Sequence, residues 1–297
     1  MPGGRILHRE SLVGSQDVTD VEPILVPVAP DHRVAVPPTQ GLPNATGYCR
    51  GTSNSAALAT RAAARATSII GELRENRPDS LPTRIDAVLI KALLAHGARW
   101  GELSSRLLAL RSDITDWRIQ REFVARWLGY GPADVDRVLT CTEQRVTLLG
   151  VGELEKNEGL VFKAPLPPSL SAQPIFRRLV VTLAWFSPTN SSHHAYRCAR
   201  LWVSPPQSDL QVKRVECVHD HAQRGTLQHD VLEGGDAVAF VDGTQIAFKV
   251  NCATDASDFD GKVPFALCVS LEVPIETGIP IYQEIRERVA PTVPIRL

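Results

Sequence analysis

Gly51-Thr52-Ser53-Asn54-Ser55-Ala56-Ala57-Leu58-Ala59-Thr60-Arg61 stands between a proline-rich N-terminal segment and a long run rich in alanine. Apolar residues recur through that run at 56, 57, 59, 62, 63, 66, 69, 70 and 73, and this pattern predicts a helix over residues 53–75. Ser53 marks the change from loop to helix. A serine there either caps the helix or acts as a nucleophile beside unpaired backbone N–H groups and the positive end of the helix dipole.

The three residues Gly51-Thr52-Ser53, followed by small residues and a long helix, resemble the catalytic-serine motif of the subtilisin-like serine peptidases, the subtilase family. That family reads Gly-Thr-Ser, any residue, Ala, any residue, Pro. This chain departs from the pattern twice, because Ser55 stands where the family has Ala and Ala57 stands where it has Pro. The resemblance implies that Ser53 is the nucleophile of an endopeptidase and forms an acyl-enzyme with its peptide substrate.

A second segment, Gly129-Tyr130-Gly131-Pro132-Ala133-Asp134-Val135-Asp136-Arg137-Val138-Leu139, resembles the turn and short helix that close subtilase catalytic domains. Between the two motifs, helical spacing predicts helices over residues 84–96, 103–110 and 117–128, with Gly97 as the stop of the first. The resemblance covers residues 1–142 and implies the helix-rich C-terminal part of an α/β domain built on a parallel sheet. Pro2 to Leu7 resembles the turn and strand that the family places before the serine, so we expect the chain to begin inside that domain.

The second half of the chain has the character of a β-sandwich. After a linker with the first strands at 143–177, a sandwich is predicted over 178–276 and a tail with a short helix over 277–297. The sequence predicts strands over residues 145–149, 178–186, 199–203, 212–218, 237–240, 245–251 and 263–273. Val181 to Trp185 also resembles a strand of the jelly-roll domain that follows the catalytic domain in some subtilases, which implies a jelly-roll-like antiparallel fold.

Composition limits the function classes. The chain has 297 residues, 43% of them hydrophobic and 22% charged, which is typical of a globular protein of one or two domains. Its net charge is −1 and it has no basic block, so we expect no nucleic-acid partner. We expect no membrane association either, because no apolar stretch approaches about 18 residues. The six cysteines are spread singly and no signal peptide precedes them, so a cytoplasmic location with reduced thiols is expected.

We expect no cofactor and no metal. The run Cys217-Val218-His219-Asp220-His221 places three metal-ligand types on alternate positions, but no second ligand pair with zinc spacing follows. Trp185, Trp202 and Tyr196 could stack on sugars, although burial in the sandwich core is the better explanation for both tryptophans.

The residues that should activate Ser53 are missing from the motif's surroundings. In the family, a histidine base and an aspartate lie far upstream of the serine. The upstream candidates Asp17, Asp20, Asp31, His8 and His32 do not sit in the family's Asp-Thr/Ser-Gly or His-Gly-Thr settings, and Asn44 does not match its oxyanion asparagine. His96, His193 and His194 lie at a helix end and in a loop, where structural roles are expected.

Losing the base alone costs about a million-fold in subtilisin, and losing the oxyanion side chain costs a further ~10²–10³. We therefore expect this chain to be inactive alone. Its partners would be a peptide or protein substrate and the missing N-terminal half of the catalytic domain. The alternative is a non-catalytic module that binds a protein or peptide, with Ser53 as a helix cap. We also expect residues 1–142 to be poorly stable alone and the sandwich to fold independently.

Overall fold

The computed structural model describes residues 7–12, 19–24, 32–36, 45–49, 51–76, 81–216, 225–289 and 295–296. Contacts divide the chain into two compact units, Met1–Arg65 and Ala66–Leu297. The first unit contains two antiparallel hairpins, β1 (Leu7–Leu12) with β2 (Thr19–Ile24) and β3 (His32–Ala35) with β4 (Thr46–Cys49). The turn and strand expected at Pro2 to Leu7 fall almost wholly outside the described residues.

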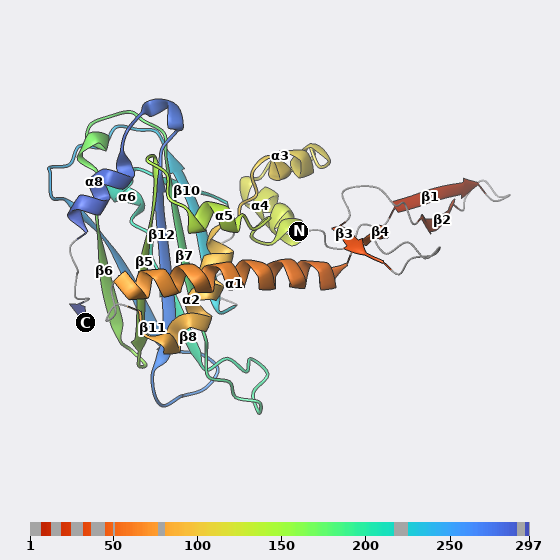
Figure 1. Ribbon diagram of the computed structural model, residues 1–297, viewed down its shortest axis with the longest axis horizontal. Coiled ribbons are helices and arrows are strands. Elements are labelled where there is room, and N and C mark those ends of the chain that lie inside the picture. The colour runs from red at the N-terminus through yellow and green to blue at the C-terminus, as the bar shows by residue number, and fades with distance from the viewer. Residues whose placement is uncertain are drawn as a thin grey trace. The chain divides into compact units, whose positions relative to one another are not determined.

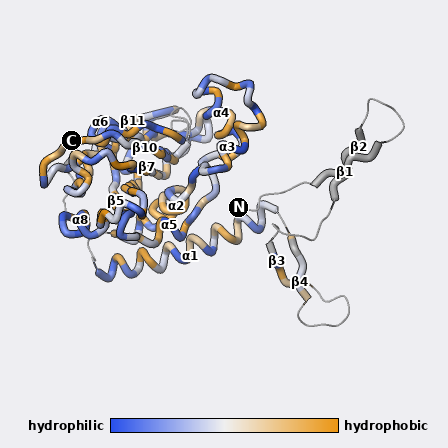
Figure 2. Tube along the Cα trace, turned by 90° about the horizontal axis from the view of Figure 1, so that it is seen from above, coloured by the Kyte–Doolittle hydropathy of each residue, from blue (hydrophilic) through white to orange (hydrophobic). Residues whose placement is uncertain are grey.

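Helix α1 (Thr52–Asn76) follows, as the alanine-rich run predicts, and apolar and polar residues interleave along it (Figures 1 and 2). Four further helical elements precede the sandwich, and three of them match predicted helices within two residues. They are η1 (Thr83–Ile85) with α2 (Asp86–His96), α3 (Glu102–Ala109), α4 (Trp117–Leu128) and α5 (Val135–Leu139). Gly97 is the C-cap of α2, as expected. The Asp116 side chain caps α4 by accepting hydrogen bonds from the backbone N–H groups of Arg118 and Ile119.

Two antiparallel sheets make up the rest of the second unit. The five-stranded sheet has the order β5-β12-β7-β10-β9, and the four-stranded sheet has the order β13-β6-β11-β8. The strands are β5 (Arg145–Leu154), β6 (Gly159–Pro165), β7 (Arg177–Trp185), β8 (Ala199–Val203), β9 (Lys213–Glu216), β10 (Leu227–Gly234), β11 (Gln245–Thr254), β12 (Val263–Glu272) and β13 (Ile295–Arg296). The connecting elements are η2 (Pro168–Leu170), α6 (Gln207–Leu210), η3 (Ile275–Thr277) and α8 (Ile281–Arg288). The last of these is the terminal helix that the sequence predicts.

The strand pairing follows one nested pattern. β5 pairs with β12, β6 with β11 and β7 with β10, each antiparallel. A long hairpin whose two arms pair in this way, and which then rolls over on itself, leaves the first, third, sixth and eighth strands in one sheet. That arrangement accounts for β5-β12-β7-β10 in one sheet and β6-β11-β8 in the other, but not for β9, which pairs with β10 in the first sheet and not with β8.

β7 is buried on both of its faces. Leu179, Val181, Leu183 and Trp185 point into the core between the two sheets, while Thr182 and its neighbours on the alternate positions face the helices. Burial on both faces explains why this strand reads as a continuous apolar run. Trp185 is fully buried, as expected.

Helix α2 covers the outer face of the five-stranded sheet. Its buried residues share one hydrophobic cluster with the end of α1 and with the outward-facing positions of β7 and β12. The cluster consists of Ala66, Ile70, Leu81, Ile85, Val88, Leu89, Ala92, Leu93, Val138, Ala184, Ala266 and Cys268. Lys91, in the middle of α2, ties the helix to the chain at the end of β7 and the start of β10, because its Nζ donates to the carbonyl oxygens of Trp185 and Thr226, at 3.0 and 2.8 Å.

The structure corrects several expectations. All strand pairs among the described residues are antiparallel, so the parallel sheet expected for the first part is not found there. Residues 237–240 lie outside any strand, and the strand expected at 212–218 is confined to Lys213–Glu216 in the described part. β6 lies within the segment 143–177, where the first strands were expected without bounds for this one, and β10 had not been predicted. The contacts divide the chain at 65/66. The predicted domain boundary at 142/143 stays a prediction.

Candidate active site at Ser53 and a buried histidine network

Ser53 lies in the first turn of α1 and its side chain is exposed. The backbone N–H groups of Asn54 and Ser55 both point to the carbonyl oxygen of Gly51, at 3.2 and 3.4 Å. Gly51 therefore holds the N-cap position, and Ser53 is the second residue inside the helix. The structure does not support the cap role that the sequence offered as the plain alternative for Ser53.

The glycine of the motif is required by its backbone. Gly51 has φ +145°, a conformation that residues with a Cβ rarely adopt. Next to it, Asn54 ties the helix start to the preceding strand, because its Nδ2 donates to the Cys49 carbonyl oxygen at 2.9 Å. The turn thus presents Ser53 at a helix N-terminus, whose backbone N–H groups and dipole favour a developing negative charge.

No acid or base is recorded in contact with Ser53 among the described residues. Asp17, Asp31 and Asn44 lie outside the described residues. His8, Asp20 and His32 lie in β1, β2 and β3, and only the backbone of these strand residues is described. The possible ligand run at 217–221 also lies outside. The part of the chain that is described contains no cluster of three or more metal-ligand side chains.

The closing segment packs against the end of α2. Gly129 and Gly131 have φ +58° and +97°, as a turn of this kind requires. The backbone N–H of Asp134 donates to the Gly97 carbonyl oxygen at 3.0 Å, and that of Arg99 donates to the Pro132 carbonyl oxygen at 3.3 Å. A Cβ added to Gly97 or Gly131 would lie 2.1 Å from a backbone oxygen. The two glycines therefore permit a close backbone approach between two segments that are separated in the sequence by α3 and α4.

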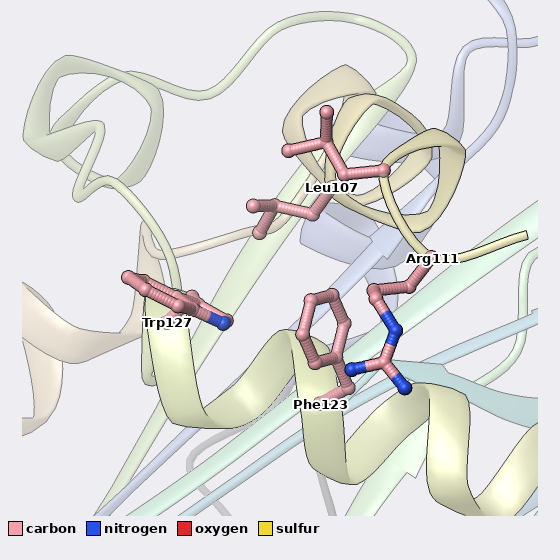
Figure 3. Close-up of a pocket in the computed structure, with 5 residues that line it drawn as sticks. Leu107, Arg111, Phe123 and Trp127 are labelled. Carbon is pink, nitrogen blue, oxygen red and sulfur yellow. The ribbon is translucent and has the colours of Figure 1, made fainter. Parts of the chain in front are cut away.

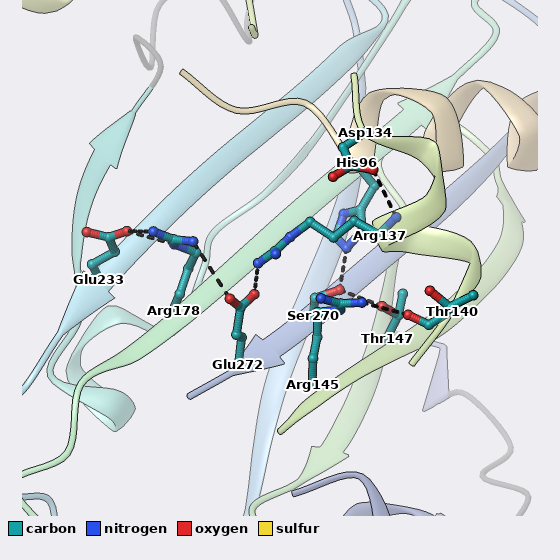
Figure 4. A network of polar contacts seen from close by, with 10 residues as sticks. All are labelled: His96, Asp134, Arg137, Thr140, Arg145, Thr147, Arg178, Glu233, Ser270 and Glu272. Carbon is teal, nitrogen blue, oxygen red and sulfur yellow. Dashed lines mark hydrogen bonds and ion pairs between the residues drawn. The ribbon is translucent and has the colours of Figure 1, made fainter. Parts of the chain in front are cut away.

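His96 belongs to a buried network between α2 and the sheet (Figure 4). Its Nε2 lies 2.6 Å from the Ser270 hydroxyl, the contact drawn in Figure 4. Its Nδ1 lies 2.7 Å from the hydroxyl of Thr182, which the figure does not draw. Thr182 also contacts Nδ1 of His229 at 2.8 Å. His229 Nε2 lies 2.9 Å from the Ala98 carbonyl oxygen. Both histidines are almost completely buried.

The carbonyl of Ala98 fixes the direction of every proton in this network. A carbonyl only accepts, so His229 Nε2 donates to it and His229 Nδ1 accepts from the Thr182 hydroxyl. Thr182 then accepts from His96 Nδ1, which leaves His96 Nε2 to accept from Ser270. Ser270 in turn accepts from the Thr147 hydroxyl, 2.7 Å away. Every ring nitrogen is satisfied with both histidines neutral.

Burial favours this neutral state. Burial, with smaller contributions from the neighbouring His229 and Arg137, lowers the pKa of His96 to about 3. Burial also lowers the pKa of His229 to about 4, although its bond to Ala98 and the charge of Asp230 oppose the shift.

The Ser270–His96 pair has the separation of a nucleophile and its base, and no motif in the sequence pointed to it. Both side chains are nevertheless buried where α2 meets the sheet, and the third group is a threonine instead of a carboxylate. Since both nitrogens of His96 are engaged inside this packed layer, the pair serves to dock α2. It does not present a reactive site to substrate.

Charged residues form a chain beside the network (Figure 4). Arg137 of α5 pairs with Glu272 of β12, and Arg178 of β7 contacts both Glu272 and Glu233, at 3.8 and 2.6 Å. Burial and, to a smaller extent, the nearby cations Arg145, Arg99 and Arg178 together lower the pKa of Arg137 to about 10. The alternation of charges secures α5, the end of the closing segment, to the outer face of the sheet.

The remaining candidates have other surroundings. His193 and His194 are exposed in the loop after β7, where His193 Nδ1 accepts from the Ala195 backbone N–H at 3.1 Å. Trp185 is fully buried and so cannot stack on a sugar, while Trp202 is half-buried against Arg200. The five described cysteines are all free thiols, as expected. Within the described ranges, no helix is both long and apolar enough to cross a membrane.

Comparisons with known proteins give little. No protein-family model matches the chain, and no curated protein matches it significantly. Two solved structures are similar in part. The first is the capsid asymmetric unit of cyanophage Pam1, at 18% identity and a TM-score of 0.23, over 44% of this chain and 83% of that one. The second is the acid-stable capsid of Helicobacter pylori bacteriophage KHP30, at 11% identity and a TM-score of 0.23, over 52% and 97%. At these TM-scores the likeness carries no argument about fold or function.

Proposed function

We propose that this chain is the C-terminal part of a subtilisin-like serine endopeptidase, with Ser53 as the nucleophile that forms the acyl-enzyme. The observation that carries the proposal is the position of Ser53. Ser53 is exposed in the first turn of a 25-residue helix, and this helix begins directly after Gly51, which has φ +145°. The first-turn N–H groups of that helix are suited to stabilise an oxyanion formed on the attacked carbonyl.

The order of elements after Ser53 supports the same proposal. A second helix, two inserted helices and a Gly-Tyr-Gly turn with a short helix follow in the order expected from the family resemblance. The three nested strand pairs of the sandwich are compatible with a jelly-roll-like domain, the class expected after the catalytic domain, although β9 pairs with β10 and not with β8.

The general base and its aspartate are proposed to come from outside these 297 residues. His96 has both ring nitrogens engaged by Thr182 and Ser270, so it is not a substitute base. A catalytic serine without a base retains almost none of its rate, so the chain alone should not cleave peptides.

The test is reconstitution. The region that encodes residues upstream of Met1, or a neighbouring gene, should encode segments of the Asp-Thr/Ser-Gly and His-Gly-Thr type. Co-expression with the product should generate peptidase activity that Ser53→Ala abolishes. Ser55→Ala is the matched control, because it introduces the family's usual residue in the same turn and should leave activity intact. Activity that survives Ser53→Ala would refute the proposal.

A second candidate is a non-catalytic module that binds a protein or peptide. The observation in its favour is that no described acid or base contacts Ser53. Under this function Ser53→Ala leaves every binding and cleavage measurement on the complete assembly unchanged, which separates it from the first candidate.

A further inference from the structure

Within the described part of residues 66–297, the α3–α4 hairpin exposes apolar side chains of Leu103, Leu110, Ile119 and Trp127, while Leu107 and Phe123 beside them are partly buried. Leu103, Leu107 and Leu110 recur at positions i, i+4 and i+7 along α3 and the residue after it. Ile119, Phe123 and Trp127 recur at i, i+4 and i+8 along α4. Each set lies on one face of its helix. We call these six residues the hairpin patch.

The two stripes of the hairpin patch face a common hollow. Leu107, Leu110, Phe123 and Trp127, together with Arg111, line an open depression of about 360 Å³ between the helices (Figure 3). Leu110 and Trp127 stand at 76% and 69% exposure, so the patch has projecting side chains beside a hollow. The opposite face of α4 is different, because Val124 and Ala125 are buried there against Trp100.

The size of the hairpin patch suits a protein interface. Its exposed side chains leave roughly 400–500 Å² of apolar surface in water, taking roughly 150–250 Å² for a large side chain. A standard interface buries about 800 Å² on each partner, of which about 450 Å² is apolar. The patch therefore provides the apolar area of one side of such an interface. Because it combines projecting side chains with a hollow, a second copy of the same surface can pack against it.

The charged residues Glu122 and Arg126 beside the apolar stripe of α4 favour an antiparallel pairing of two α4 helices. In an antiparallel pairing of two α4 helices about a twofold axis at Phe123, Ile119 lies opposite the partner's Trp127. A rise of 1.5 Å per residue then places Glu122 about 3 Å along the axis from the partner's Arg126. Glu122 and Arg126 lie on the same flank of the stripe, so the twofold brings them together twice. Both are exposed, and no ion pair is recorded for either within the described residues.

We infer that the hairpin patch is a dimer interface, in which two copies of this chain pair antiparallel through α4, with Trp127 of each copy packed against Ile119 of the other. A twofold interface uses the same surface on both copies, and aromatic anchors in pockets supply most of the energy of such contacts. This inference is independent of the peptidase proposal, because none of these residues belongs to the Ser53 site.

Sedimentation velocity of the full chain across a concentration series tests the inference. The wild type should associate to a dimer at or below micromolar concentration, the weak end for interfaces of this size. Trp127→Glu should weaken the dimer about thirtyfold or more. Val241→Glu is the matched control, because Val241 is 78% exposed outside the patch and its replacement should leave the dimer unchanged.

Charge reversal tests the pairing of Glu122 with the partner's Arg126, provided that the helix content of each variant matches that of the wild type, since the two residues are also i,i+4 neighbours within α4. Glu122→Arg and Arg126→Glu should each weaken the dimer about two- to fivefold, and the double variant should restore it because both symmetric pairs form again. A chain that is monomeric well above micromolar concentration would overturn the inference, whether the patch then binds another protein or nothing. A dimer that Trp127→Glu leaves intact, or that the double reversal fails to restore, would also overturn it.

Discussion

At the scale of single residues, Ser53 is a position that can be changed without cost to the fold. Its side chain is exposed, and the N-cap position belongs to Gly51. We predict that Ser53→Ala changes the free energy of unfolding by less than about 0.5 kcal/mol, in contrast to the ~1 kcal/mol that a lost cap would cost. Urea denaturation of the variant checks this value. A loss near 1 kcal/mol would show that Ser53 caps the helix in solution.

The buried histidines predict how stability depends on pH. The native pKa values of His96 and His229 are lowered to about 3 and about 4, whereas a histidine in the unfolded chain has a pKa of about 6.5. Below pH ~6.5 the unfolded state therefore binds protons that the native state does not, so stability is complete above that pH and falls as the pH drops toward 4. The slope should approach about 1.4 kcal/mol per pH unit for each histidine.

Urea unfolding between pH 7.5 and 5 measures this slope above the range where most carboxylates titrate. His96→Gln should reduce it by about half, and His193→Gln, which changes an exposed histidine, should leave it as in the wild type. An unchanged slope in His96→Gln would contradict the network as described.

At the scale of elements, the contact between the closing turn and the end of α2 depends on glycine. A Cβ on Gly131 would lie 2.1 Å from the Arg99 carbonyl oxygen, and the residue also has φ +97°. Gly101 has φ +52° but nothing within 4 Å of the same atom. We predict that Gly101→Ala costs about 1–3 kcal/mol through backbone strain alone, and that Gly131→Ala costs clearly more. Thermal or chemical denaturation of the pair of variants compares them, and equal losses would refute the close approach.

Local patterns in the sequence located most elements, and the misses have physical causes. Spacing and caps were sufficient for α1, α2 and α4, because their apolar faces and end signals are encoded within each helix. β10 was missed because Gln228, His229 and Asp230 make it look polar. Those side chains are buried, and their partners come from β7, β8, β9 and the loop after α2. No pattern within the strand could reveal those partners.

The candidate site divides in the same way. The position of Ser53 at a helix start was predicted from three residues and the helix after them, because that arrangement is local, and its role as a nucleophile stays a proposal. The His96 network was not found, since Thr182, Ser270 and His229 lie 86 or more residues from His96 and only sheet pairing brings them together. The sequence predicted a structural role for His96, and the network gives that role its partners.

At the scale of the whole molecule, the shared cluster between α2 and the five-stranded sheet sets the folding unit. The sequence favoured a sandwich that folds independently of the helices. The contacts favour one unit over residues 66–297, because the outer sheet face carries Ala184, Ala266 and Cys268 under α2. We predict that a fragment of residues 143–297 exposes this face and loses cooperative unfolding.

Hydrogen exchange of the full chain tests this unit directly. Amides of α2 and of β7 should exchange through openings of equal free energy, as expected for one cooperative unit. A fragment of residues 143–297 that unfolds cooperatively with the stability of the full chain would restore the sequence-based expectation.

The central claim is that Ser53 is a nucleophile whose base lies outside these residues. A fluorophosphonate probe, followed by mass spectrometry of the modified peptide, tests it most directly, because the probe reports an activated serine and the spectrum identifies which one. If the base lies outside these residues, the probe should not label the chain alone. It should label Ser53 once the segment that carries the histidine and aspartate is supplied. Labelling of Ser53 in the isolated chain, or of Ser270 in its place, would contradict the account, as would a complete assembly in which Ser53 stays unlabelled.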